Sequence, residues 1–232
     1  MQLCPSFAIR YTDRAEAFRQ AIVNLPYCHS NIKKYLGKWH RMANRQPIEQ
    51  YIPGGADGQY VFHCSTLWKN DEWNRNDETV NMARARFLRT MRNFETINLE
   101  GGLVSYRTDP EAHQFDDCLT RQYNSSEYLQ KTRRSCFVFN TPAYWGCHGW
   151  KLGEFMALGK AILSTPIQNP LPAPLTHRTH IHFVENTEEA ISEGIAYMYG
   201  NPEYRHTLEK NILKYWQDYG SPEATIKLLG IK

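Results

Sequence analysis

Apolar and polar residues alternate after residue 58 in a pattern that predicts strands followed by helices. An apolar run at 59–64 precedes a helical stripe of Val80, Ala83, Phe87 and Met91, so a strand and a helix are expected there. Strands that alternate with helices predict an α/β fold with a doubly wound parallel sheet. The other strands are expected at 97–99, 136–139, 161–164 and 180–184, and the other helices at 125–134, between Gly149 and Gly159, at 187–199, around 208–216 and from 221.

Glycines and prolines mark the turns of this pattern. Gly101 and Gly102 are expected to end the second strand in a flexible turn, next to Glu100 at the rim of the sheet. Before residue 59 the pattern differs, because two helical stretches with one apolar face each are followed by a Pro- and Gly-rich segment at 47–58. We therefore expect a helical N-terminal appendage at 1–58 and the main domain at 59–232.

Composition narrows the class of protein. The net charge is +3 and the basic residues are mixed with acidic ones, so a dedicated nucleic-acid binder is not indicated. There is neither a signal-like start nor an apolar window of about 18 residues, which indicates a cytoplasmic protein and leaves peripheral membrane contact open. The six cysteines form no CxxC pair and are expected to be reduced thiols.

The segment 135–165 carries the clearest candidate chemistry. It is expected to form a strand, a polar loop, a helix and a second strand around a single acid, Glu154. A helix that begins beyond the carboxyl end of a strand directs unpaired N–H groups into the crevice above the sheet, where anions bind. Gly149 would let a phosphate approach the backbone, Lys151 would add charge, and Glu154 would accept hydrogen bonds from ribose. This pattern favours a nucleoside diphosphate.

The same segment resembles a known family. GWKLGEFMALGKAILST (149–165) is similar to the donor-binding signature of GT-B fold glycosyltransferases, in which a glycine-containing turn, a helix with Glu, a small residue, Gly and an apolar strand follow in that order. YLQKTRRSCFVFNTP (128–142) and the loop at Leu171-Pro172 look like the exostosin-like and group 1 branches. The resemblance covers about 60–232 and implies a Rossmann-like, C-terminal, nucleotide-sugar-binding half.

The resemblance also implies roles for particular residues. Glu154 would bind the ribose, and the backbone of Gly149, Trp150 and Lys151 would face the diphosphate. Gly146 stands where many group 1 members place a second acid that contacts the transferred sugar, so the mechanism class stays open. Members of this fold usually carry a second full domain for the acceptor. The acceptor site is therefore expected to be minimal, shared with a partner subunit, or absent from this chain.

Further candidates follow from their positions alone. Ser65 and Thr66 end the first strand at the crevice, where hydroxyls commonly meet ligands. His148 is a candidate general base or an ordinary loop histidine. Arg133 and Arg134 precede a strand and are candidates for facing the diphosphate, or a solvated helix end. Metal binding is a further candidate, because three histidines lie close together in the sequence at His177, His180 and His182. They lack a carboxylate or Cys ligand at a suitable spacing, so no metal site is predicted.

These observations together predict a metal-independent GT-B glycosyltransferase of polysaccharide biosynthesis with no cofactor. Its substrates would be a nucleotide-sugar donor and a glycan or lipid-linked acceptor. The alternative is a non-catalytic nucleotide-sugar-binding partner subunit, which the glycine at position 146 favours. A dinucleotide-binding enzyme is not expected, because HCSTLWKN rather than GxGxxG follows the first strand.

Overall fold

The computed structural model describes residues 45–68, 77–105, 110–143 and 146–230. The two helical stretches expected before residue 45 lie outside the described residues, so the division at residue 58 stays a prediction. Among the described helices, none has the length and apolar character needed to cross a membrane.

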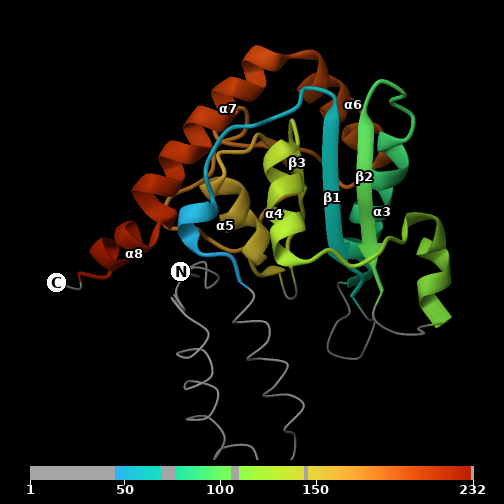
Figure 1. Cartoon of the computed structure of the whole chain (residues 1–232), viewed down its shortest axis with the longest axis horizontal. Helices are drawn as coiled ribbons and strands as arrows, with labels where there is room; N and C mark the ends of the chain where they lie inside the picture. The colour runs from blue at the N-terminus through green and yellow to red at the C-terminus, as the bar shows by residue number, and fades with distance from the viewer. Residues whose placement is uncertain (1–44, 69–76, 106–109, 144–145, 231–232) are drawn as a thin grey trace, which may run out of the picture.

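The strands form two parallel sheets that lie side by side (Figure 1). In the first, β1 (Tyr60–Thr66) pairs with β2 (Asn98–Val104). In the second, β3 (Val138–Asn140) pairs with β4 (Ile162–Ser164), which pairs with β5 (His182–Phe183). The N–H of Cys136 donates to the carbonyl of Tyr60 at 2.8 Å and so links the residue stretch before β3 to β1.

This order creates a switch point in the topology. The chain runs from β1 outward to β2 and then returns to the other side of β1 for β3. The carboxyl ends of β1 and β3 therefore lie next to each other at the switch point, which in parallel α/β folds is where a ligand crevice commonly lies.

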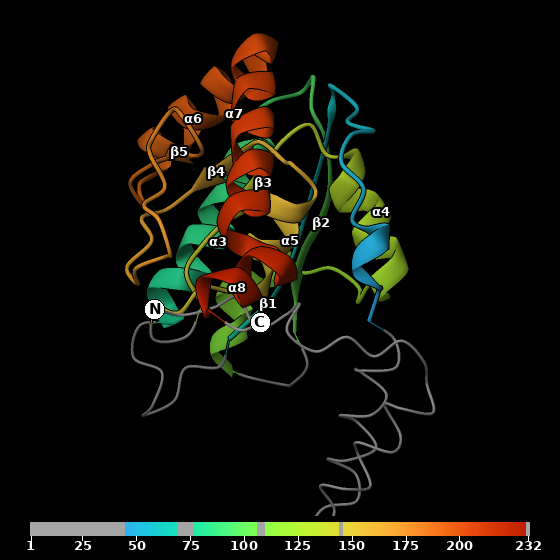
Figure 2. The ribbon, with the colours of Figure 1, turned by 90° about the vertical axis from the view of Figure 1, so that its left-hand side faces the viewer.

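Helices cover both faces of the strands, and Figure 2 shows α4 and α6 on opposite sides of them. On one face, α3 (Asp77–Met91) packs against α6 (Glu188–Gly200). On the other face, α4 (Ser125–Arg134) packs on β1 and α5 (Trp150–Ala157) packs on β3 and on α7 (Pro202–Tyr215). The shorter elements are the 3₁₀ helices η2 (Ile48–Gln50) and η3 (Pro110–Cys118), the π turn η5 (Trp216–Gly220) and α8 (Pro222–Leu228).

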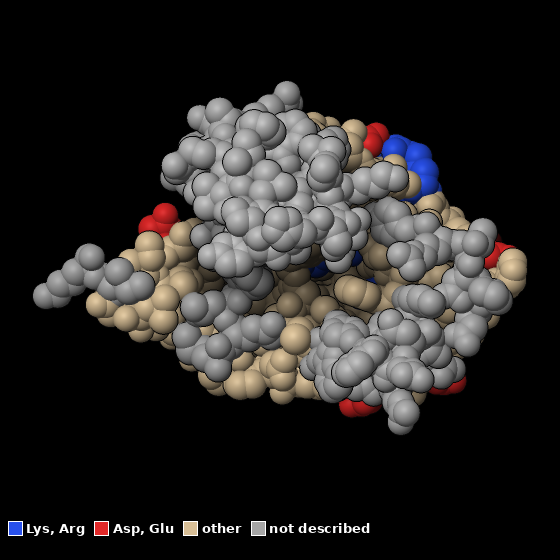
Figure 3. All heavy atoms as spheres, turned by 90° about the horizontal axis from the view of Figure 1, so that it is seen from below, with Lys and Arg blue, Asp and Glu red and all other residues tan. Residues whose placement is uncertain are grey.

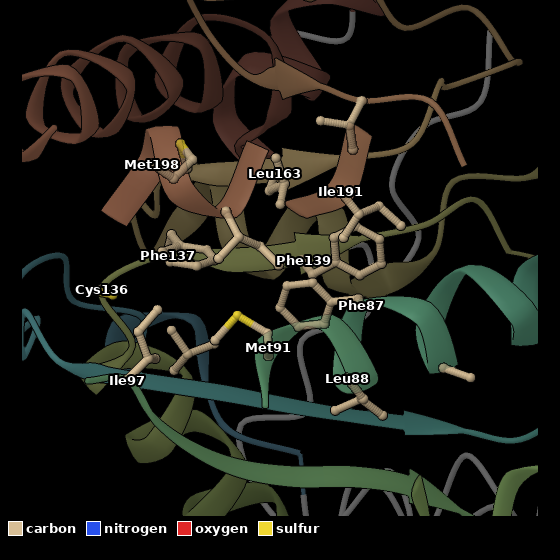
Figure 4. Close-up of a cluster of buried hydrophobic side chains, with 14 of the residues drawn as sticks. Phe87, Leu88, Met91, Ile97, Cys136, Phe137, Phe139, Leu163, Ile191 and Met198 are labelled. Carbon is tan, nitrogen blue, oxygen red and sulfur yellow. The ribbon is translucent and has the colours of Figure 1, made fainter. Parts of the chain in front are cut away.

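The larger core cluster lies between the strands and the α3–α6 pair (Figure 4). Phe87 of α3 stacks on Phe139 of β3, with ring centroids 4.3 Å apart and an interplanar angle of 3°. Leu163 and Ile191 belong to the same fully buried cluster. This packing fixes the position of α3 against β3. It therefore also fixes where the side chains of α3 that face the switch point lie.

The helix predicted between Gly149 and Gly159 forms as α5, and its end follows from one residue. Gly159 has φ +58°, the left-handed conformation that commonly terminates a helix and that glycine adopts without strain. Its N–H donates to the carbonyl of Met156. The predicted helices at 125–134 and 187–199 are likewise confirmed as α4 and α6.

The turn predicted at Gly101 and Gly102 is wrong, because both residues lie inside β2. Gly101 has φ +101°, and a Cβ there would lie 2.1 Å from the carbonyl oxygen of His63 on β1. The glycine therefore permits a close approach of two strands rather than a turn. Glu100 consequently lies within β2 and away from the rim. There it accepts a hydrogen bond from Tyr60 Oη at 2.7 Å and forms an ion pair with Lys131.

Candidate functional site

The candidate site lies at the switch point, where β1 and β3 end and α5 begins (Figure 1). Figure 3 shows this edge of the molecule from below, with Lys and Arg atoms visible in a recess. Gly149 caps α5 in an extended conformation (φ −66°, ψ 150°), and a Cβ placed there would lie 3.6 Å from that of Ala143. Ligands of parallel α/β proteins commonly bind at this kind of edge.

Lys151 of α5 points across the crevice to the end of β1. Its ammonium donates to Ser65 Oγ at 2.7 Å and to the carbonyl of Cys64. Burial, reinforced by the positive charge of Arg84, lowers the pKa of Lys151 to about 7, although Cys64 and Glu154 oppose this shift. The lysine therefore changes its protonation state near neutral pH, and a bound anion would favour its charged form.

Arg84 is a second buried cation in the site, and it was not predicted from the sequence. Its Nε donates to Thr141 Oγ1 at 3.1 Å and its Nη1 donates to the carbonyl of Thr66 at 2.8 Å, so it connects the ends of β3 and β1. The residue is only 7% exposed. One signal was available in the sequence, because Arg84 interrupts the apolar stripe between Val80 and Phe87.

His63 contacts Ser65, the hydrogen-bond acceptor of Lys151, from inside the domain. Its Nε2 lies 3.0 Å from Ser65 Oγ, and its ring packs against Phe87 and Phe139. Burial holds the pKa of His63 well below its usual value, with the charges of Lys151 and Arg84 acting in the same direction. Because Ser65 Oγ accepts a hydrogen bond from Lys151, its own O–H is available to donate to the neutral Nε2 of His63.

Glu154 lies three residues after Lys151, so both side chains project from the same side of α5. Its Oε1 accepts a hydrogen bond from Tyr51 Oη at 2.9 Å. Its Oε2 is buried and has no hydrogen-bond partner within the described ranges. Burial raises the pKa of Glu154, while the Tyr51 hydrogen bond, the charges of Lys151 and Arg45 and the nearby Tyr128 hydroxyl oppose the shift.

The arrangement suits an anion that also carries hydroxyl groups. The positive charges of Lys151 and Arg84 repel each other where little water screens them. A bound anion near both side chains would relieve that repulsion. The first turn of α5 adds backbone N–H groups to the same crevice. One turn further on, the unpaired carboxylate oxygen of Glu154 is an acceptor for a hydroxyl.

The structure brings together five of the predicted residues: Gly149, Lys151, Glu154, Ser65 and Thr66. Trp150, also predicted, begins α5 and is 57% exposed. Arg133 and Arg134 are not brought to this cluster, because they end α4 at the edge where the strands begin. There Arg134 pairs with Asp57 at 2.8 Å, and the carbonyl of Arg133 accepts from Lys160 Nζ.

His148 lies on a different side of α5. It is buried and lines a pocket together with residues that include Leu152, Met156 and Trp216. The empty volume of this pocket is about 430 Å³, a figure that includes open solvent. Its Nε2 lies 3.5 Å from the carbonyl of Pro170, and burial lowers its pKa. The pocket-facing side of α5 is opposite the side that carries Lys151 and Glu154.

The three histidines near β5 make contacts of their own. The Nδ1 atoms of His180 and His177 accept from backbone N–H groups, and His182 Nδ1 lies 2.9 Å from Tyr204 Oη. Within the described residues, no group of three His, Cys, Asp or Glu side chains is arranged to hold a metal ion.

Solved structures share this fold. A glycosyltransferase from Rickettsia africae ESF-5 is similar with a TM-score of 0.50 and 11% identity, over 78% of this chain and 47% of that chain. The sucrose-phosphate synthase of Thermosynechococcus elongatus has a TM-score of 0.52 and 16% identity, over 80% and 49%. TarM has a TM-score of 0.50 and 11% identity, over 78% and 35%.

These likenesses confirm the predicted fold. The chain has the Rossmann-like fold of one half of a GT-B glycosyltransferase, as the segment 149–165 indicated. It spans about half or less of the length of these structures. No protein-family model and no curated protein matches the sequence.

Proposed function

We propose that this chain binds a nucleotide-sugar donor and transfers its sugar to a glycan or lipid-linked acceptor, in the biosynthesis of a polysaccharide. The observation that carries the proposal is the position of Lys151, Arg84 and Glu154 at the switch point, where the ammonium of Lys151 is close to both the Arg84 guanidinium and the Glu154 carboxylate. A nucleoside diphosphate has the matching charges, because its phosphates are anionic and its ribose carries hydroxyls.

The diphosphate would lie against the start of α5. Glycosyl transfer builds negative charge on the leaving diphosphate, and fixed donors that face this charge lower the barrier. Lys151 and Arg84 supply positive charge, and the N-terminal N–H groups of α5 supply donors. These groups can stabilise the leaving group without a metal, so we propose a metal-independent reaction. The ribose would then lie over Glu154, about one turn along the helix.

The residue that would activate the acceptor is left unassigned. Gly146 has φ +67°, and a Cβ there would lie 2.4 Å from Gln168 Oε1, so the backbone at this position favours glycine over an acid. His148, the candidate base, lies in an apolar pocket on the opposite side of α5 from Lys151. The proposal therefore specifies the donor site and not the stereochemistry of transfer.

Gly146 also favours a second candidate function. A chain without the sugar-contacting acid is suited to bind a nucleotide sugar as a non-catalytic partner subunit. In either case we propose a cytoplasmic protein that works with an acceptor-binding partner or at a membrane surface.

Assays of donor turnover separate the two functions. The purified chain is incubated with common nucleotide sugars, alone and with a membrane fraction from its source, and release of nucleoside diphosphate and labelled glycan is measured. A transferase gives slow donor hydrolysis alone and efficient transfer with the membrane fraction. Donor binding with no turnover under either condition would contradict the enzyme and support the partner subunit.

A further inference from the structure

Tyr51 reaches the candidate site from outside the βα units. It follows η2 and precedes β1, and it packs against the apolar cluster formed by α5, α7 and the π turn. Figure 1 shows the segment with η2 beside α5 and α4. The Tyr51 hydroxyl donates to Glu154 Oε1 across 103 positions of sequence, at 2.9 Å. The carboxylate is therefore held from two directions, by its own helix and by this segment.

The hydrogen bond leaves the two carboxylate oxygens in different states. Oε1 has the Tyr51 hydroxyl as a donor, whereas Oε2 is buried and lacks a hydrogen-bond partner in the part of the chain that the structure describes. A buried acceptor without a donor is unfavourable, so a ligand hydroxyl that reached Oε2 would bring a gain. Ionised carboxylates accept such hydrogen bonds strongly.

We propose that Tyr51 is a positioning residue, which fixes the Glu154 carboxylate so that Oε2 accepts a ribose hydroxyl of the donor. The inference rests on the proposed function, because it assigns the ribose to Glu154. It adds that recognition of the ribose depends on a residue of the segment before the Rossmann-like unit.

The charges around Glu154 give this role a second consequence. Lys151 from α5, Arg45 and Tyr51 from the preceding segment and Tyr128 from α4 all face the carboxyl group. Burial raises the pKa of Glu154, and the Tyr51 hydrogen bond opposes that shift. Without the phenol, Glu154 would take up its proton at a higher pH and would then lose the ionised form that accepts most strongly.

The test compares ribose recognition with phosphate recognition. Titration calorimetry measures the dissociation constants of UDP, GDP, ADP and CDP, and of the 2′,3′-dideoxy analogue of whichever binds most tightly. Tyr51→Phe is expected to weaken binding of the ribonucleoside diphosphate by roughly tenfold and to leave the affinity for the dideoxy analogue unchanged. Tyr204→Phe removes a tyrosine hydroxyl beside His182, away from the site, and serves as the matched control that changes neither constant.

Two further measurements separate positioning from a general effect on folding. The pH below which the ribonucleoside diphosphate loses affinity should rise in Tyr51→Phe relative to the wild type. Tyr51→His, which keeps a ring N–H donor, should recover part of the ribose preference.

Equal weakening of both ligands, or unchanged or tighter binding of the ribonucleoside diphosphate, would overturn the role of Tyr51 and leave the proposed function standing. If none of the nucleoside diphosphates binds the wild type, the proposed function is wrong and the role of Tyr51 falls with it.

Discussion

Lys151 Nζ lies 2.7 Å from Ser65 Oγ, so the first turn of α5 is joined to the end of β1 by a partly buried ammonium group. The two residues come from elements on different sides of the switch point, and their contact places a cation in the crevice between β1 and β3. A protein rarely buries a lysine without a compensating role, because desolvation of the ammonium is costly. Anion binding is such a role.

The titration of Lys151 predicts how ligand affinity changes with pH. Burial lowers its pKa to about 7, so the free protein carries the charge below that pH and loses it above. Affinity for a nucleoside diphosphate should therefore fall as the pH rises from about 6 to about 8. Lys151→Met should bind roughly tenfold more weakly at the lower pH and approach the wild type at the higher pH.

Titration calorimetry across this pH range measures the effect. The ligand phosphates titrate in the same range, but they do so identically with both proteins, so the difference between wild type and Lys151→Met isolates the lysine. A constant difference at every pH would contradict the assignment.

Arg84 should be required for anion binding, because it places a guanidinium beside Lys151. Arg84→Met is expected to weaken binding of the nucleoside diphosphate by about tenfold or more, which is the effect expected from losing one charged hydrogen bond. Arg86→Met is the matched control, since Arg86 lies on the same helix and donates to Asn186 instead. Equal affinities of the two variants in calorimetry would show that Arg84 only connects the strands.

Gly101 should be needed for folding rather than for binding. A Cβ at this position would collide with the carbonyl of His63, and φ is +101°, a region that other residues rarely adopt. Gly101→Ala should therefore lower the free energy of unfolding in urea by more than about 2 kcal/mol.

Gly58 provides the control for this change, because a Cβ there meets nothing within 4 Å and its backbone is unstrained. Gly58→Ala should change the free energy of unfolding by less than about 0.5 kcal/mol. Similar losses in the two variants would mean that the close approach of β2 to β1 does not limit stability.

Much of the fold could be predicted because its signals are local. The helical spacing of Val80, Phe87 and Met91 defines α3, and Gly159 marks the end of α5. Gly101 was misjudged because a glycine in a turn and a glycine under a neighbouring strand look alike in sequence. Only the partner strand, with the carbonyl of His63, distinguishes the two.

The candidate site was predicted only where the local sequence pattern reveals it, at the start of α5 and at Ser65 and Thr66, which end β1. Glu154 and Lys151 lie three residues apart on one helix, so their proximity follows from helical geometry. Arg84 and Tyr51 approach them from α3 and from the segment before β1, and such approaches depend on how whole elements pack. The Pro- and Gly-rich composition around Tyr51 indicated a boundary, not a residue that contacts the site.

The central claim is that Glu154 lies in a nucleoside diphosphate site. The most direct measurement is the thermal shift of the wild type and of Glu154→Ala across a panel of nucleoside diphosphates. We expect at least one ligand to raise the melting temperature of the wild type, and Glu154→Ala to fold but lose most of that shift. An equal shift in both proteins, or no shift of the wild type with any member of the panel, would contradict the account.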